Sequence, residues 1–345
     1  MTTMATDMAD ATANQSREQR RLSVFPFFVG CGRSGTTLIR NIFSSHPDLA
    51  IPPESHFLGR MIELESTYNG PAGFSAQRFL ADLFARPWLA HWELGEEAIK
   101  EAILSDPPTD LADAVRLVFG LYAQLSGKPR YGDKTPRYVL YLPQIAELFP
   151  EARFVHIVRD GRDVTLSLLE KEWGANNAIE GALFWKRRVE AGREAGRALG
   201  PLRYHEVRYE NLVDDTEAIV RSVCEFIELP FDPVMLRFYE GPRPDVERGV
   251  RRRGGLGRKG GLLRPPTKGL RDWRRQMSKI DVAVFEVLAG DLLRELGYQR
   301  GVDRLSPWAR FRVGIRVMGH RIRFAARRVF RRARFQRGVR VMESD

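Results

Sequence analysis

The stretch VFPFFVGCGRSGTTLIR, residues 24–40, predicts a buried strand, a glycine-rich turn and the first turns of a helix. Its apolar run, Val24–Val29, is typical of a central strand. Gly30, Gly32 and Gly35 allow backbone N–H groups to converge on an anion at the start of the helix. The stretch therefore predicts a phosphate-binding turn in an α/β fold.

This turn lacks the lysine of nucleotide-triphosphate loops. In the pattern G-x-x-x-x-G-K-[ST] a lysine follows the last glycine and reaches the β- and γ-phosphates. Here Thr36 stands at that position, Thr37 follows it, and Arg33 lies inside the turn. The turn can still bind a charged group, but its residues indicate a donor without a γ-phosphate.

A second segment carries the residues for another phosphate. Phe154–Val158 predicts a buried strand, which ends in Arg159-Asp160-Gly161-Arg162-Asp163 and leads into a helix containing Ser167. A guanidinium and a hydroxyl at this spacing can meet at one phosphate. The alternative interpretation is a solvated turn with internal ion pairs.

With both segments in view, the chain resembles the sulfotransferases that use 3′-phosphoadenosine 5′-phosphosulfate (PAPS), closest in motif style to the Glu-base bacterial and tyrosylprotein-type members. Their donor loop has Lys or Arg followed by Ser-Gly-Thr-Thr, matched here by Arg33-Ser34-Gly35-Thr36-Thr37. The resemblance covers about residues 23–300. It implies a three-layer α/β fold with a central, mainly parallel sheet and a P-loop-like turn, and it assigns the 3′-phosphate to Arg159 and Ser167.

Glu54 and His56 are the candidate general bases. Pro52 and Pro53 stiffen the chain before Glu54, which we expect near the mouth of the turn. Sulfuryl transfer requires the acceptor hydroxyl to lose its proton, and a carboxylate or an imidazole can take it. If the segment is extended, both side chains point the same way. Glu54 is favoured, because many members of the resembled family have a Glu at about this distance.

Two further positions match the resembled family. Lys134, in the run Tyr131-Gly-Asp-Lys-Thr-Pro136, is expected to join Arg33 in stabilising the charge that develops during transfer; a solvent-exposed lysine at a helix start is the alternative. We expect the helix after Lys134 to run through Leu140 and Leu148. Tyr209, after a predicted strand over 202–208, either contacts the nucleotide or packs at the end of the sheet.

The acceptor is not identified by the sequence. Aromatic residues between 57 and 130 are expected to build part of its pocket and hint at an apolar partner, although core packing explains them equally well. They are Phe57, Phe74, Phe79, Phe84, Trp88, Trp92 and Phe119. The acceptor class therefore stays open among small molecules, lipids, glycans and peptides.

Composition divides the chain into three parts: a disordered leader (1–22), a catalytic domain (23–300) and an arginine-rich tail (301–345). Residues 241–269 combine glycines with basic residues and predict a lid. The resemblance implies that Lys268, with Gly269 and Trp273, helps this lid close over the 3′-phosphate of the donor. A disordered basic linker is the alternative.

The tail accounts for the positive charge of the chain, which is +11 overall. Residues 304–340 contain thirteen arginines and no acid, and Phe311, Ile315, Met318, Ile322, Ala325 and Val329 form an apolar stripe at helical spacing. This pattern favours peripheral contact with an anionic membrane over protein docking, and nucleic acid least of all, because no nucleic-acid recognition motif accompanies it.

The sequence predicts a cytoplasmic transferase, peripheral at the inner face of the membrane. Cys31 and Cys224 make no disulfide framework, and no histidine or cysteine has metal-ligand spacing, so no metal is expected. The predicted reaction is sulfuryl transfer from PAPS to a hydroxyl acceptor. The alternatives are a kinase-like phosphoryl transferase, for which we find no Walker lysine or magnesium carboxylate, and a non-catalytic protein of the membrane surface.

Overall fold

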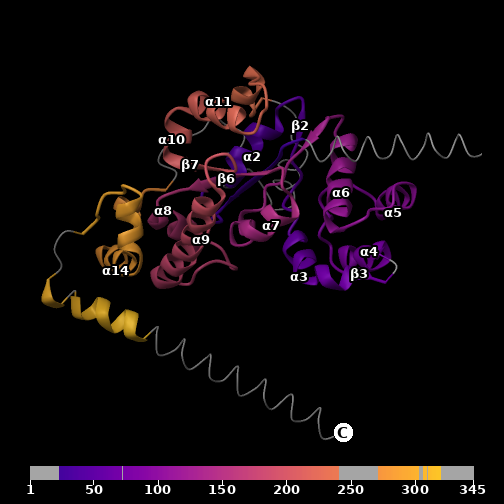
Figure 1. Cartoon of the computed structure of the whole chain (residues 1–345). Helices are drawn as coiled ribbons and strands as arrows, with labels where there is room; N and C mark the ends of the chain where they lie inside the picture. The colour runs from indigo at the N-terminus through magenta and orange to yellow at the C-terminus, as the bar shows by residue number, and fades with distance from the viewer. Residues whose placement is uncertain (1–22, 72, 241–270, 303–305, 309, 320–345) are drawn as a thin grey trace, which may run out of the picture. The chain divides into compact units, whose positions relative to one another are not determined.

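The computed structural model describes residues 23–71, 73–240, 271–302, 306–308 and 310–319. The predicted leader, the predicted lid with Lys268, and the tail beyond residue 319 lie outside the described residues. Two compact units are present (Figure 1). The first holds the residues up to Arg159 and those from Arg188 to Glu240; the second holds Asp160–Arg187 and the residues from Arg271 onward.

Parallel strands organise the first unit. β1 (Phe25–Gly30) pairs in parallel with β6 (Ala152–Val158), and β6 pairs in parallel with β7 (Tyr204–Arg208). A second parallel set consists of β2 (Leu49–Ala50) and β5 (Arg130–Tyr131). Parallel neighbours need crossover connections, as the βα pattern of the sequence predicts.

A backbone bridge joins the two sets of strands. Asp133, just after β5, bridges in parallel to Phe27 of β1, and the N–H of Phe28 donates to the carbonyl of Asp133 at 2.8 Å. The parallel order is therefore β2, β5, β1, β6, β7. This order places residues after β5 on one side of β1 and residues after β6 on the other.

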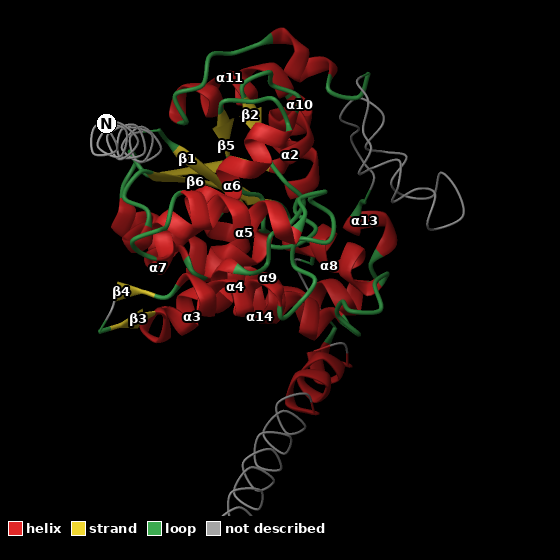
Figure 2. Cartoon of the chain, turned by 90° about the vertical axis from the view of Figure 1, so that its right-hand side faces the viewer, coloured by secondary structure: helices red, strands yellow, loops and turns green. Residues whose placement is uncertain are grey.

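Both faces of the sheet are covered, which makes three layers (Figure 2). Val24 and Phe28 pack with α2 (Thr36–Ser44), α10 (Tyr209–Asp214) and α11 (Thr216–Phe226). The alternate side chains of β1 pack on the opposite face with α3 (Leu58–Tyr68), α6 (Leu111–Leu125) and α7 (Leu142–Leu148). Because β1 is buried on both faces, its sequence is a continuous apolar run. The predicted fold class is confirmed.

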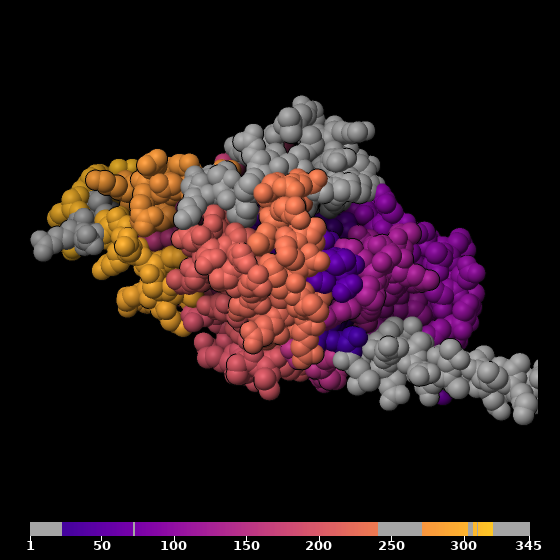
Figure 3. Space-filling view, turned by 90° about the horizontal axis from the view of Figure 1, so that it is seen from above, coloured from indigo at the N-terminus to yellow at the C-terminus, as the bar shows by residue number. Residues whose placement is uncertain are grey.

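The remaining elements of the first unit are short. They are α3 (Leu58–Tyr68), β3 (Asn69–Gly70), β4 (Gly73–Phe74), α4 (Ala76–Phe84), α5 (Glu96–Ser105), α6 (Leu111–Leu125), η1 (Pro136–Leu140), α7 (Leu142–Leu148) and η2 (Pro233–Arg237). The single helix expected through Leu140 and Leu148 is wrong: a 3₁₀ turn ends at Leu140 and a separate helix begins after Tyr141. On the face seen in Figure 3, the orange segment that contains η2 adjoins the indigo segment that contains α2.

The aromatic residues between 57 and 130 form core. Phe57, Phe79, Trp92 and Phe119 are fully buried in the cluster beneath β1, with Trp92 and Phe119 edge to face at 5.1 Å. The other aromatics named from the sequence, Phe74, Phe84 and Trp88, pack against that cluster. Core packing therefore accounts for them, and they give no information on the acceptor.

The second unit is helical. It contains α8 (Gly161–Leu169), the first turns of α9 (Ala178–Leu199), α13 (Trp273–Gln276), α14 (Lys279–Glu295) and a last helix with described residues 307–308 and 310–319. Val313 and Val317 of the last helix are buried with Ala283 and Val284 of α14. Within the described residues, every helix is too short or too polar to cross a bilayer.

Candidate active site

The glycine-rich turn joins the end of β1 to the start of α2. Gly35 precedes α2 with φ 96°, in the left-handed region that favours glycine, and Arg33 has φ 76°. Ser34 and Thr36 are buried, and no described residue makes a hydrogen bond to Ser34 Oγ. A buried hydroxyl without a partner is rare, so the turn has hydrogen-bonding capacity directed at something other than the described chain.

Tyr209 connects this turn with the end of β6. A Cβ on Gly35 would lie 2.3 Å from Cδ2 of the Tyr209 ring, so the ring packs directly on the turn. The Arg159 guanidinium lies over the same ring, 4.3 Å from its centroid. The pairing of Gly30 with Ile157 explains why the two segments meet: the carboxyl ends of neighbouring parallel strands share one edge of the sheet. From the sequence, Tyr209 could either contact the nucleotide or pack at the end of the sheet. In the structure, its ring contacts both predicted phosphate segments, at Gly35 and at Arg159.

Glu54 and Lys134 form an ion pair beside β1. Nζ of Lys134 lies 2.5 Å from Oε1 of Glu54. The Lys134 side chain is buried, whereas a third of the Glu54 side chain is exposed. The alternative of a solvent-exposed lysine is therefore wrong. Of the predicted catalytic residues, the structure brings Glu54, Lys134 and His56 into direct contact.

The ion pair changes the proton affinity of both groups. Burial alone would raise the pKa of Glu54, but the hydrogen bond from His56 and the charge and hydrogen bond of Lys134 outweigh it and lower that pKa to about 2. Burial lowers the pKa of Lys134, and the Glu54 carboxylate opposes that shift. An ionised Glu54 therefore favours the charged form of Lys134.

His56 reaches Glu54 through a tight turn. Its Nε2 lies 3.2 Å from Oε2 of Glu54. The expectation of an extended segment is wrong, because His56 has φ 53° and the N–H of Phe57 donates back to the carbonyl of Ser55 at 2.6 Å. This three-residue γ-turn is a strained conformation for a residue other than glycine. This γ-turn, rather than an extended conformation, brings the His56 imidazole into contact with the Glu54 carboxylate.

A buried network that the sequence did not reveal holds this segment. Ser55 Oγ lies 2.8 Å from Oδ2 of Asp133, 3.2 Å from Oγ1 of Thr135 and 2.7 Å from the hydroxyl of Tyr138. The N–H of Ser55 donates to Thr135 Oγ1 at 3.0 Å, and all four residues are buried. Because Ser55 adjoins Glu54 and Asp133 adjoins Lys134, the network fixes the two backbones that carry the ion pair. One clue to this network was available in the sequence: Ser55 and Asp133 directly adjoin the two predicted catalytic residues, Glu54 and Lys134.

Asp133 carries a buried carboxyl at the centre of this network. Burial raises its pKa to about 7, although hydrogen bonds from Ser55 and Thr135 and the charge of Lys134 act in the opposite direction. Oδ1 of Asp133 has no hydrogen-bond partner among the described residues.

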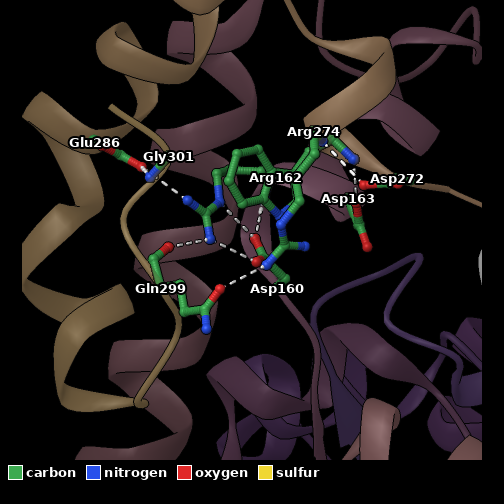
Figure 4. A network of polar contacts seen from close by, with 9 residues as sticks. Asp160, Arg162, Asp163, Asp272, Arg274, Glu286, Gln299 and Gly301 are labelled. Carbon is green, nitrogen blue, oxygen red and sulfur yellow. Dashed lines mark hydrogen bonds and ion pairs between the residues drawn. The ribbon is translucent and has the colours of Figure 1, made fainter. Parts of the chain in front are cut away.

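In the second unit, the Arg-Asp-Gly-Arg-Asp run contains a buried network around Arg162 (Figure 4). Nε and Nη2 of Arg162 donate to the two carboxylate oxygens of Asp160 at 3.0 and 2.7 Å. Nη1 donates to Glu286 at 2.8 Å and Nη2 to the carbonyl of Gln299 at 2.9 Å. The guanidinium lies 3.6 Å from the centroid of the Trp273 ring.

This network ties α8 to α13 and α14. The N–H of Trp273 donates to Asp163 at 2.9 Å, and the N–H of Gly301 donates to the same Glu286 that binds Arg162. Arg162 is fully buried, so the ion pairs expected for a solvated turn exist but lie inside the fold. Arg162 therefore stabilises the second unit, whereas Arg159 ends the strand of the first.

The other predicted donor residues have separate positions. Thr37 is the second residue of α2, and Ser167 is buried on α8 of the second unit. Lys268 lies outside the described residues. Within the described part of the chain, no group of three or more His, Cys, Asp or Glu side chains is placed to hold a metal ion.

Comparison with known proteins gives consistent results. The chain is 25% identical to the protein-tyrosine sulfotransferase of Drosophila melanogaster over 222 residues, which are 62% of this chain and 40% of that protein. It is 26% identical to the nodulation protein NoeE of Sinorhizobium fredii over 348 residues, 91% of this chain and 74% of that protein. The chain thus spans less than half of the Drosophila relative.

A solved structure shares the fold. It is the sulfotransferase domain of the Synechococcus olefin synthase, with a TM-score of 0.56, 23% identity, and coverage of 80% of this chain and 95% of that domain. A sequence model of the sulfotransferase family matches residues 26–233, which include the glycine-rich turn, the Glu54–Lys134 pair and Arg159. This chain belongs to the sulfotransferase family.

Proposed function

We propose that this chain transfers a sulfuryl group from PAPS to a hydroxyl acceptor. The observation that carries the proposal is the Glu54–Lys134 pair: a carboxylate with access to solvent and a buried ammonium 2.5 Å from it, next to β1 and its phosphate turn. This arrangement supplies both a proton acceptor and a fixed positive charge. PAPS, when bound, supplies the sulfuryl group.

The described residues fit a donor with phosphate groups. Ser34 Oγ is buried without a described partner, and Gly35 leaves no room for a Cβ. We assign residues 33–37 (Arg, Ser, Gly, Thr and Thr) to the 5′ end of the donor. Arg159 is assigned to the 3′-phosphate, with Tyr209 beside it. The same role for Ser167 and the role of Lys268 stay predictions from the resemblance.

Glu54 removes the proton from the acceptor hydroxyl as that oxygen attacks sulfur. The buried Lys134 ammonium beside it stabilises negative charge on the departing oxygen. Arg33, inside the turn, provides a second cation. Since the pair is preformed, little reorganisation is needed when charge develops.

The acceptor is a hydroxyl compound whose class stays open among small molecules, lipids, glycans and peptides. Since the relatives include protein-tyrosine sulfotransferases, a tyrosyl peptide is the first acceptor to test. Two buried, free cysteines support placement in the reducing cytoplasm.

The last helix, with described residues 307–308 and 310–319, supports contact with an anionic lipid surface. Trp308, Phe311, Ile315 and Met318 are more than half exposed, while Val313 and Val317 pack inward. Exposed arginines at 310 and 312 complement anionic headgroups.

Vesicle sedimentation tests this lipid contact. The protein should sediment with phosphatidylglycerol-containing vesicles but not with pure phosphatidylcholine vesicles, and replacing both Phe311 and Ile315 by serine should abolish the binding. Serine at exposed Leu104 of α5 is the control; no difference between the two vesicle types, or self-association instead of vesicle binding, would refute the lipid surface.

Calorimetric binding of the desulfated product, 3′-phosphoadenosine 5′-phosphate (PAP), tests the donor site. We expect binding that requires the 3′-phosphate, with adenosine 5′-phosphate and ATP–magnesium as controls. Arg159→Ala should weaken PAP binding by at least about tenfold, because it removes a charge-assisted contact. Preference for ATP–magnesium would instead favour the kinase-like alternative, and an Arg159→Ala protein with unchanged affinity would overturn the assignment of Arg159.

A further inference from the structure

We propose that His56 is the second carrier of the acceptor proton: it receives the proton from Glu54 and releases it to solvent. This inference rests on the proposed function and adds to it a route for the proton. The base itself was the point that the sequence left open between Glu54 and His56, and the geometry points to both acting in series.

The first argument is the division of the Glu54 carboxylate between two partners. Oε1 contacts Lys134 at 2.5 Å, and Oε2 contacts Nε2 of His56 at 3.2 Å. The exposed fraction of the side chain rises along this row, from 4% for Lys134 through 34% for Glu54 to 48% for His56. His56 therefore lies at the solvent end of a continuous contact that begins in the buried site.

The second argument is the proton affinity of Glu54. A carboxyl group whose pKa is lowered to about 2 is ionised at neutral pH, so Glu54 does not retain a proton there. The Nε2 of His56, 3.2 Å from Oε2, is placed to accept that proton. Transfer from Glu54 to a contacting imidazole restores the carboxylate and with it the ion pair that favours the charged form of Lys134. The charge of Lys134 acts on the Glu54 carboxylate, and the charges of Asp133 and Arg40 act on Lys134.

The third argument is the backbone. His56 is one of four described residues other than glycine with a positive φ. The γ-turn is held at both ends, because Ser55 is fixed in the buried network with Asp133 and Phe57 is fully buried in the core. Such strained turns persist where the surroundings enforce them, and they concentrate at functional sites. Here the enforced turn sets the imidazole against the carboxylate.

The proton balance is complete. The acceptor oxygen forms a bond to sulfur, the bond between sulfur and the bridging phosphate oxygen breaks, and the acceptor proton moves to Glu54. From Glu54 the proton moves to Nε2 of a neutral His56, and the resulting imidazolium loses a proton to solvent. One proton is released for each sulfuryl group transferred, and no further reactant is needed.

The test compares His56→Asn with the unchanged protein. Asparagine tolerates the left-handed backbone and can donate a hydrogen bond to Glu54, but it cannot carry the proton. Two readouts are used: PAP affinity by calorimetry, and the single-turnover rate of PAP formation from PAPS across pH, with water and then a tyrosyl peptide as acceptor. His91→Asn, at an exposed histidine, is the matched control.

We expect His56→Asn to bind PAP with unchanged affinity and to form PAP from PAPS about 10- to 100-fold more slowly. Its pH–rate profile should differ from that of the unchanged protein, and added imidazole should restore part of the rate. Unchanged rate and profile, or a loss of PAP affinity without rescue by imidazole, would overturn the relay and leave the proposed function standing. An unchanged protein that binds no PAP, or forms no PAP from PAPS with either acceptor, would overturn the proposed function and the relay together.

Discussion

Replacement of Asp133 by asparagine should make stability less dependent on pH. The carboxyl is fully buried, and its pKa is raised from 3.8 to about 7 in the folded protein. Between these two values the unfolded chain has released the proton and the folded chain keeps it. The native state therefore binds more protons, and the stability contributed by this group is lost as pH rises through this window.

The magnitude follows from the width of the window. Each unit of pKa difference corresponds to about 1.4 kcal/mol, so the cost of ionising Asp133 grows by ~2–3 kcal/mol between about pH 5 and about pH 8. An asparagine side chain does not ionise and has no such cost. The free energy of unfolding of Asp133→Asn, relative to the unchanged protein, should rise by this amount over the same range. A constant offset is expected as well, because the amide adds a donor to the network.

Urea unfolding at a series of pH values measures the difference. The difference in stability between the two proteins is more informative than either protein's stability alone. Burial also lowers the pKa of His156 to about 3, and this makes the stability of both proteins rise with pH up to about 6.5. Asp291→Asn, at an exposed side chain, is the matched control. A difference that stays constant from about pH 5 to about pH 8, or that falls, would refute the reasoning.

Two further substitutions test the turn and the Arg162 network. Gly35→Ala should abolish PAP binding in calorimetry, because a Cβ would meet the Tyr209 ring at 2.3 Å at a left-handed position; Gly95→Ala, where a Cβ would have no heavy atom within 4 Å, is the control, and equal binding by both variants would contradict this. Arg162→Met should cost about 3–5 kcal/mol in urea unfolding, because two buried carboxylates lose their cation; Arg294→Met, at an exposed side chain, should cost far less, and similar losses for both would count against the network.

The sequence predicted the features that are local. The strand, turn and helix at residues 24–44 follow from an apolar run, three glycines and the helical spacing after Thr36, and the structure has them there. The Glu54–Lys134 contact was expected only as two roles in one site. Its partners lie eighty positions apart, and the resemblance, not the spacing, put them together.

The rest depended on contacts that no local pattern encodes. Ser55 and Asp133 are ordinary residues in the sequence, and their importance comes from a hydrogen bond between distant segments. The positive φ of His56 could not be predicted, because it is imposed by the anchoring of its two neighbours, and few residues other than glycine adopt it. In the sequence, Arg162 has the pattern of one partner in a surface ion pair. In the structure, Glu286 of α14 and the Trp273 ring contact it and bury it.

The packing of Tyr209 on Gly35 also affects how the protein is made. During synthesis the turn at residues 30–36 emerges early, but β1 has only the bridge to Asp133 until its full-length parallel partner β6 follows, and the turn has no covering ring until Tyr209 follows. Long-range parallel pairing is slow and leaves apolar strands exposed meanwhile. A nascent chain that ends before Tyr209 should therefore bind no donor, and the strand Phe25–Gly30 is the segment for which protection by a chaperone would matter most.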